Sequence, residues 1–202
     1  VAGAVADHIL AAILTDKFAN DVTKISVNNG GDVAFWTAPD AKTKAQLAGV
    51  AGGMVTIHGP TVWRGLATSG WRGRSHSLGI ADSVTVLART AATADVAATL
   101  IANSVTLSSH SGIERVPANS LNPESDLGER LVTIAVPPLP RDDLLAALDG
   151  GQTLAQHMLD QDHIAGAVIS LQGHNEIIGM TGKNITPEID KNNKRKIEKH
   201  YV

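Results

Sequence analysis

The stretch that decides the fold is residues 67–103, ATSGWRGRSHSLGIADSVTVLARTAATADVAATLIAN. Within it, SVTVLA at residues 83–88 is a run of β-branched and aliphatic side chains, which predicts a buried strand. An alanine-rich segment over residues 91–105 follows and predicts a helix, for which Thr90 or Thr93 would be the N-cap. The sequence therefore predicts a strand that leads directly into a helix.

Asp95 and Thr99 form a D-x-x-x-T pair in this helix. Residues four apart share one helix side, so a carboxylate and a hydroxyl oxygen would meet the same ligand. Mg²⁺ prefers such hard oxygens and often takes only one or two protein side chains, so the pair predicts a magnesium site. The alternative is structural: Asp95 favours the positive helix end, and Thr99 hydrogen-bonds back to the carbonyl of residue 95. For the pair alone this alternative is the commoner one.

The residue types in the loop before the predicted strand favour binding of an anion. Glycines allow close backbone approach, hydroxyls donate hydrogen bonds, and guanidinium groups match phosphate or carboxylate oxygens. The candidate binding residues are Thr68, Ser69, Gly70 and Arg74, and His76 is the histidine embedded among them. The alternative is a glycine-rich turn with ordinary surface arginines.

Residues 28–32, NNGGD, predict a tight hairpin turn between short strands at 24–27 and 33–36. Asp32 could accept a hydrogen bond from a base or a ribose hydroxyl. In the alternative it satisfies only the backbone of its own turn.

Elsewhere the pattern predicts a first helix, further strands, a long polar loop and two short helices separated by glycines. These elements are a helix at 1–19, strands at 54–58, 131–136 and 165–171, a further strand that begins within 61–66, a loop at 110–129, and helices at 141–148 and 154–162.

Composition excludes several classes of protein. The 17 Lys and Arg against 20 Asp and Glu give a net charge of −3, so no basic field favours nucleic acid. The absence of cysteine excludes disulfides and thiolate sites. The histidines lack zinc-ligand spacing, and neither a G-x-S-x-G nor a Walker-type motif is found. No apolar run approaches the ~20 residues that cross a membrane.

We expect one domain over residues 1–185 and a basic polar tail over 186–202. The chain begins at Val1 without Met, inside a predicted helix, so we expect that an upstream part is missing. The composition leads us to expect a cytoplasmic protein.

In chain order these motifs resemble the ApbE family of magnesium-dependent flavin transferases, and more closely a small uncharacterised family related to it. ApbE proteins have an alanine- and glycine-rich helix, an N-x-G-G-D turn, an S-T-S-G loop, a histidine segment, an SVTV strand and a helix that opens A-D-x-x-x-T. The counterparts here are, in the same order, residues 1–19, 28–32, 67–70, 75–77, 83–87 and 94–99. The match spans roughly half of the chain and implies a shared fold.

The resemblance also implies roles for single residues. Asp95 and Thr99 match the magnesium ligands, and His76 falls close to the active-site histidine. The residues that match a loop near the flavin nucleotide are Asn29, Gly31 and Asp32. Flavin transferases hold FAD with Mg²⁺ at the pyrophosphate and transfer FMN to a protein threonine hydroxyl, with release of AMP. This is phosphoryl transfer, in which positioning and charge neutralisation dominate catalysis.

The sequence also departs from the flavin transferases. Their early helix has an A-K-G stretch, whereas residues 3–8 read GAVADH, without lysine and with an acid. Their histidine precedes an I-D-P-like element, whereas His76 is followed by Ser-Leu-Gly. Residues 115–118, 123–128 and 165–173 resemble the uncharacterised relatives instead. Fold therefore carries over more safely than reaction.

The sequence thus predicts an α+β, ApbE-like domain with a mixed or antiparallel sheet and packed helices. Its expected function is to bind FAD or a similar nucleotide with magnesium, as an FMN transferase with an acceptor protein. The alternative is a ligand-binding or assembly protein without catalysis. A third hypothesis is a structural subunit of a homo-oligomer, in which Asp95 and Thr99 only cap and pack.

Overall fold

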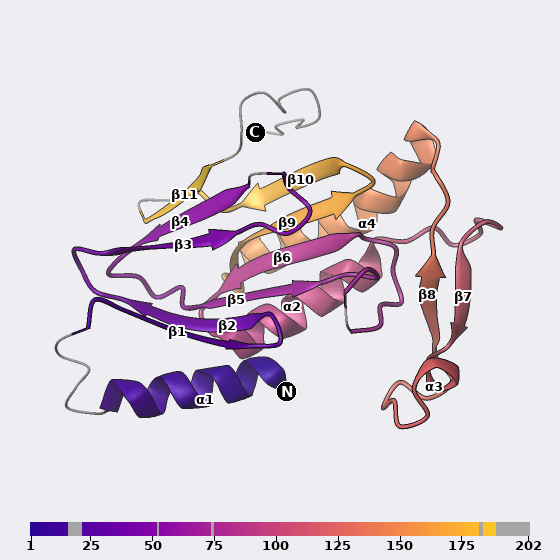
Figure 1. Ribbon diagram of the computed structural model, residues 1–202. Helices are drawn as coiled ribbons and strands as arrows, with labels where there is room; N and C mark the ends of the chain where they lie inside the picture. The colour runs from indigo at the N-terminus through magenta and orange to yellow at the C-terminus, as the bar shows by residue number, and fades with distance from the viewer. Residues whose placement is uncertain (16–21, 52, 74, 182–183, 189–202) are drawn as a thin grey trace.

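The computed structural model describes residues 1–15, 22–51, 53–73, 75–181 and 184–188. Helices and strands in this part of the chain form an α+β fold (Figure 1). The helices are α1 (Ala2–Thr15), α2 (Ala91–Ser104), α3 (Ala118–Leu121) and α4 (Arg141–Asp160). The strands are β1 (Lys24–Asn29), β2 (Asp32–Thr37), β3 (Lys42–Gln46), β4 (Met54–His58), β5 (Gly65–Ser69), β6 (Ser83–Ala88), β7 (Glu114–Pro117), β8 (Leu131–Ala135), β9 (Ile164–Leu171), β10 (His174–Gly179) and β11 (Ile185–Glu188).

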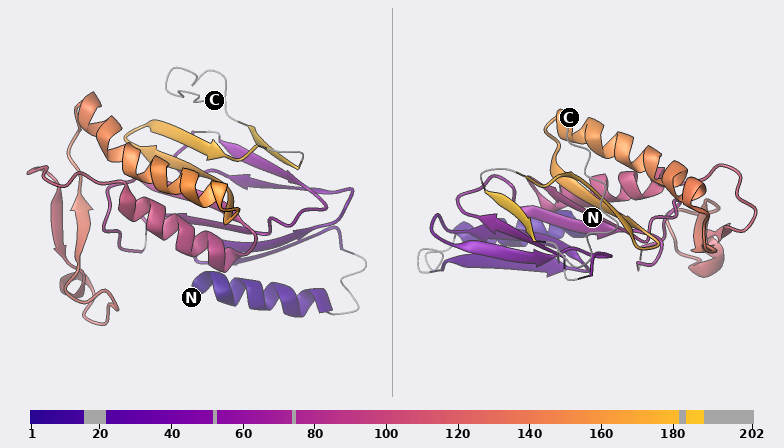
Figure 2. Two further views of the ribbon diagram at one scale, coloured as in Figure 1. Left: turned by 180° about the vertical axis from the view of Figure 1, so that it is seen from behind. Right: turned by 90° about the horizontal axis from the view of Figure 1, so that it is seen from above.

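A six-stranded sheet in the order β1-β2-β5-β6-β9-β10 forms the centre of the molecule. All its strand pairs are antiparallel, so the antiparallel form of the two expected sheet types is the one that occurs. The helices α1, α2 and α4 pack on one face, and the three-stranded sheet β11-β4-β3 covers the other (Figure 2).

The unit of β6 and α2 lies at the centre of this arrangement. Every residue of β6 is buried, because the strand is covered on both faces. The buried side of α2 is mostly alanine, which lets the helix approach the sheet closely. Thr90 is the N-cap, and its hydroxyl accepts a 3.1 Å hydrogen bond from the Thr93 backbone nitrogen. The predicted strand, helix and cap are confirmed.

The helix α4 is continuous, so the prediction of two short helices around Gly150 and Gly151 is wrong. A Cβ at Gly150 would lie 2.5 Å from the Ser104 carbonyl oxygen, and one at Gly151 would lie 2.4 Å from Val105 Cγ2. These glycines let α4 pack closely against the end of α2. The stability gained by close helix packing outweighs the low helix propensity of glycine.

The predicted loop at 110–129 is also partly wrong, because it contains β7 and α3. With β8, these elements form a two-stranded arm that projects from the body (Figures 1 and 2). Three further strands, β3, β10 and β11, were not predicted, and β5 begins only at Gly65. β3 reads KTKAQ, and such a half-exposed strand with two lysines has no strong local signal.

Both chain ends differ from expectation. α1 ends at Thr15, and residues 16–19 of the expected first helix lie outside the described residues. β11 pairs with β4 up to Glu188, so the first residues of the expected tail belong to a sheet. The rest of that tail, residues 189–202, lies outside the described part.

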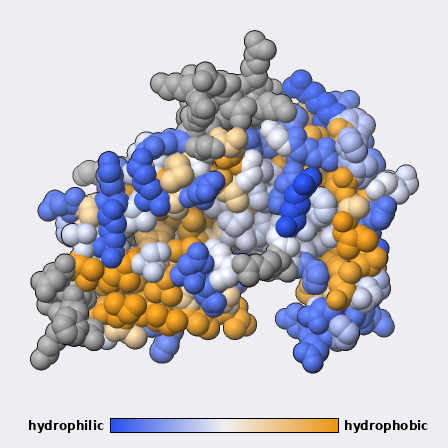
Figure 3. Space-filling model, in the orientation of Figure 1, coloured by the Kyte–Doolittle hydropathy of each residue, from blue (hydrophilic) through white to orange (hydrophobic). Residues whose placement is uncertain are grey.

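Apolar surface remains exposed over α1 and the neighbouring hairpin of β1 and β2, and over the arm (Figure 3). On α1 the exposed side chains Val5, Ile9 and Ile13 are spaced by four residues and follow one side of the helix. None of the helices in the described residues combines the length and the apolar character needed to cross a membrane.

Candidate functional site

One side of α2 carries a row of polar side chains. Asp95, Thr99 and Asn103 are spaced by four residues, and each is half-buried. The first two share a helix side, as their spacing predicts. Asp95 Oδ2 lies 3.5 Å from the Val1 nitrogen, whereas the Thr99 hydroxyl makes no hydrogen bond to another described residue. The bond of the structural alternative, from this hydroxyl back to the carbonyl of residue 95, is therefore not formed in the described part, and the oxygen is available to a ligand.

A second carboxyl group, that of Asp32, contacts Asp95. Asp32 begins β2 after a turn in which Gly30 and Gly31 have φ values of +70° and +113°, a conformation that favours glycine. Burial raises the pKa of Asp32 to about 6, with further contributions from the charge of Asp95 and a hydrogen bond between the two carboxyl groups. A hydrogen bond from the Gly3 backbone acts in the opposite direction. A cation bound between the two carboxyl groups would stabilise the ionised form of Asp32.

The start of α1 completes this region. Asn29 Nδ2 donates a 3.2 Å hydrogen bond to the Ala2 carbonyl oxygen. A Cβ at Gly3 would lie 2.5 Å from the Ala91 carbonyl oxygen, so only glycine fits between the first turns of α1 and α2. The hairpin turn, the start of α1 and one side of α2 therefore meet.

Asp7 lies in the segment where the flavin transferases carry a lysine, and it has a structural role. Its two carboxylate oxygens accept hydrogen bonds from the backbone nitrogens of Ala91 and Ala92, at 2.9 and 2.8 Å. These N–H groups lie in the first turn of α2 and have no partner within the helix. A carboxylate at this position is also stabilised by the helix dipole. The N-terminus of α2 is therefore occupied by a side chain of the chain itself.

The candidates of the 67–76 loop are dispersed. Thr68 shares a 2.9 Å hydroxyl contact with Thr85, and strand alternation places Thr68 on the sheet face opposite α2, whereas Ser69 faces α2. Gly70 has φ +148°, and a Cβ there would lie 2.6 Å from the Asp82 carbonyl oxygen. Arg74 lies outside the described residues.

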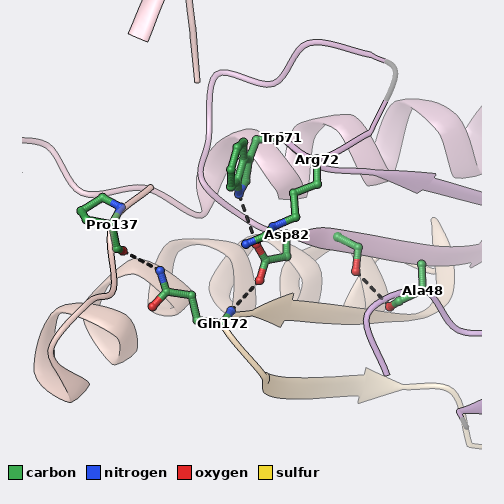
Figure 4. Close-up of polar contacts among 7 residues, drawn as sticks. Ala48, Trp71, Arg72, Asp82, Pro137 and Gln172 are labelled. Atoms are coloured by element: carbon green, nitrogen blue, oxygen red, sulfur yellow. Dashed lines mark hydrogen bonds and ion pairs between the residues drawn. The ribbon is translucent and has the colours of Figure 1, made fainter. Parts of the chain in front are cut away.

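The start of this loop is fixed by Asp82 (Figure 4). Trp71 Nε1 and Arg72 Nε donate to Asp82 Oδ1 at 3.2 and 2.6 Å, and the Gln172 backbone nitrogen donates to Oδ2 at 2.6 Å. The Arg72 guanidinium also lies 4.9 Å from the centre of the Trp71 ring. Arg72 thus pairs with Asp82, which reduces its capacity to bind an added anion.

His76 is half-buried near the other end of the loop. The residues that follow it contact the last turn of α2: Asn103 Oδ1 accepts from Ser77 Oγ at 3.1 Å and from the Leu78 nitrogen at 2.9 Å. His76 thus lies next to a segment attached to the α2 side that carries Asp95 and Thr99.

The side-chain oxygens of this region are of the kind that Mg²⁺ prefers: the carboxylates of Asp32 and Asp95, which contact each other, and the Thr99 hydroxyl on the same side of α2 as Asp95. The described residues contain no group of three or more His, Cys, Asp or Glu suited to a metal. A cation here would need water or other oxygen ligands to complete its shell.

Sequence reasoning missed Asn103 and the contact of Asp32 with Asp95. Asn103 could have been found, because it continues the four-residue spacing of the other two residues. The carboxyl contact could not have been found, because it depends on the packing of α1, α2 and the hairpin.

Comparison with known proteins assigns this chain to a family. A family model described as AbpE bacteria matches residues 1–177. The chain belongs to the AbpE bacteria family. It is also similar to a UPF0280 protein of Methanothermobacter thermautotrophicus, with 44% identity over 84 residues. That match covers 39% of this chain and 32% of the relative, so it spans about a third of the relative's length.

Proposed function

We propose that this member of the AbpE bacteria family binds Mg²⁺ together with a phosphate-bearing cofactor, FAD or a similar nucleotide. The observation that carries the proposal is the contact between the half-buried carboxyl groups of Asp32 and Asp95. Burial and the neighbouring charge of Asp95 disfavour ionisation of Asp32, so a divalent cation bound between the two carboxylates would stabilise the charged form of Asp32.

In this proposal Asp95, Thr99 and Asp32 hold the cation, and a backbone oxygen at the start of α1 would be a further ligand. The turn residues Asn29 and Gly31 would contact the nucleotide, together with Ser69 and Gly70 at the end of β5. Mg²⁺, when bound, would neutralise charge on the phosphates. Thr68 is a weaker candidate for nucleotide binding than the sequence predicts, because its side chain lies on the sheet face opposite α2.

The enzymatic form of the proposal is an FMN transferase that acts on a threonine hydroxyl of an acceptor protein. The phosphorus–oxygen bond to the AMP part of FAD would break, and a bond from FMN phosphorus to the threonine oxygen would form. His76 would accept the hydroxyl proton, because imidazole can exchange protons near neutral pH. The resemblance to flavin transferases supports this reaction.

A ligand carrier or assembly protein is the second candidate, and a specific observation favours it. Residues 3–8 contain no lysine, and Asp7 in this segment caps α2 instead of stabilising negative charge. Losing a preorganised charge-stabilising group commonly lowers turnover by ~10²-fold or more. Slow or absent transfer with retained binding would therefore fit the altered site.

Association with a second copy is a further proposal, since the exposed Val5, Ile9 and Ile13 follow one side of α1. An acceptor protein is required only by the transferase form. Location in the cytoplasm remains a prediction from composition.

Titration calorimetry with Mg²⁺ and FAD tests the proposal. Asp95→Asn should weaken FAD binding in the presence of Mg²⁺ by about tenfold or more, equivalent to about 1.4 kcal/mol. Asp149→Asn on the exposed side of α4 is the matched control and should bind like the wild type. Equal binding by Asp95→Asn and the wild type would contradict the proposed cation site.

Mass spectrometry separates the two forms of the proposal. The chain is incubated with FAD, Mg²⁺ and a threonine-containing acceptor peptide, and the FMN adduct is measured. An adduct that requires both Asp95 and His76 supports the transferase, whereas binding without an adduct supports the carrier.

A further inference from the structure

The segment that follows His76 is attached to the last turn of α2 by side-chain and backbone contacts. Asn103 Oδ1 accepts hydrogen bonds from Ser77 Oγ and from the Leu78 backbone nitrogen. Ser77 is almost fully buried, and its hydroxyl oxygen accepts a 3.2 Å bond from the Gly79 nitrogen. The Asn103 carboxamide thus bonds directly to Ser77 and Leu78, and Ser77 in turn bonds to Gly79.

Close packing supports this attachment. A Cβ at Gly79 would lie 2.0 Å from the Ala102 carbonyl oxygen, so the backbone lies directly against α2. The Ile80 nitrogen donates to the Val105 carbonyl oxygen at 2.8 Å, and the Thr133 nitrogen donates to the Ser77 carbonyl oxygen at 2.8 Å. The segment is therefore held between α2 and the arm.

We propose that Asn103 is the positioning residue that sets His76 at a fixed distance from the cation side of α2. This inference rests on the proposed function, because it assigns His76 and Asp95 to one site. Asn103 lies on the same helix side as Asp95 and Thr99, and the 1.5 Å rise per residue separates it from them by about 12 and 6 Å along the axis. Through its carboxamide, the helix that carries the cation ligands also positions the histidine.

The contact made by Asn103 depends on its side chain, unlike the backbone contacts of this segment. The bonds to Val105 and Ser77 are made by backbone groups, which any sequence supplies. The carboxamide acceptor is a property of the side chain, and its loss would leave the Ser77 hydroxyl and the Leu78 N–H without their partner. His76 directly precedes these two residues, so it would then lose the support of the segment that follows it.

A distance measurement in the ligand-free protein tests the positioning directly. The chain has no cysteine, so Val96→Cys on α2, where Val96 is 59% exposed, accepts a single nitroxide label. The label broadens the His76 imidazole signal in the NMR spectrum, and His76→Gln identifies that signal. In Asn103→Ala the broadening should change about twofold or more, and amide exchange at Leu78 and Gly79 should accelerate about tenfold.

Two variants control for general damage. Asn103→Asp keeps a side-chain oxygen acceptor and should restore the His76 signal. Ser77→Ala removes one of the two bonds to Asn103, should give an intermediate change, and remains informative if Asn103→Ala fails to fold. Wild-type broadening in Asn103→Ala, or in Ser77→Ala when Asn103→Ala does not fold, would overturn the proposal.

The binding assay adds a functional measurement. Asn103→Ala should weaken FAD binding with Mg²⁺ about tenfold while Mg²⁺ alone binds within about threefold of wild type. Because Asn103 acts through His76, the Asn103→Ala and His76→Gln double variant should bind no more weakly than His76→Gln. Additive losses would overturn the proposal. If the wild-type chain binds neither ligand, the proposed function fails, and the NMR distances still decide whether Asn103 positions His76.

Discussion

Asp32 at the start of β2 and Asp95 on α2 bring their carboxyl groups into contact, although the two residues are far apart in the sequence. The Asp32 carboxyl group ionises less easily than an isolated one, because burial and the neighbouring charge of Asp95 disfavour its charged form. The contact lies in the region where the sequence motifs predicted a cation.

Titration of Asp32 tests this relationship. In a carboxyl ¹³C NMR titration, we expect a midpoint at about 6 for Asp32, compared with the ordinary value of 3.8. Asp95→Asn should lower this midpoint but leave it above the ordinary value, because burial is the largest cause of the shift and is unchanged. An unchanged midpoint in Asp95→Asn would show that the two side chains do not interact.

The same pKa predicts the pH dependence of stability. Between about pH 4 and 6 the folded chain binds more protons at Asp32 than the unfolded chain, so this residue's contribution to the free energy of unfolding falls as pH rises. Asp32→Asn removes this dependence, so its stability relative to wild type should be greater at pH 7 than at pH 4.5. Urea unfolding at both pH values measures the difference. A relative stability that decreases with pH would contradict the prediction.

Asp7→Ala should destabilise the fold, because it removes the acceptor of two backbone N–H groups at the start of α2. Loss of a helix cap typically costs about 0.5–2 kcal/mol. Asp7→Asn keeps one oxygen acceptor and should lose less. Urea unfolding checks both, and an Asp7→Ala protein as stable as wild type would rule out the capping role.

Gly151→Ala should also destabilise the protein, even though alanine is the better helix former. The added Cβ would lie 2.4 Å from Val105 Cγ2, and overpacking typically costs about 1–3 kcal/mol, against about 1 kcal/mol gained in helix propensity. Thr153→Ala on the exposed side of α4 is the control and should be neutral or slightly stabilising. Thermal unfolding compares the two variants, and a stabilised Gly151→Ala would contradict close packing of α4 on α2.

Asp82→Ala should cost more stability than Arg72→Ala. Asp82 accepts three hydrogen bonds and is largely buried, and bonds to a charged group contribute about 1.5–3 kcal/mol. Arg72 is mostly exposed, and such surface ion pairs contribute up to about 1 kcal/mol. Denaturant unfolding followed by tryptophan fluorescence measures both, and equal losses would show that Asp82 acts only through Arg72.

Local patterns predicted some elements and missed others for physical reasons. The SVTVLA strand, the cap at Thr90 and the NNGGD hairpin have strong signals, because β-branched runs, capping hydroxyls and tight glycine turns act within a few residues. The continuity of α4 depends on its contacts with Ser104 and Val105, which are distant in sequence. The strands β3 and β11 gain their partner only when β4 lies between them.

By itself, the sequence determined that Asp95 and Thr99 share a helix side and that Asp32 follows a tight turn, because helix periodicity and glycine conformation are local properties. Only the tertiary structure decided that Asp32 contacts Asp95, that Asp7 caps α2 and that Asn103 holds the segment after His76. These contacts join distant segments, and they form because burial of the alanine-rich side of α2 brings the first helix, the hairpin and the loop to the same surface.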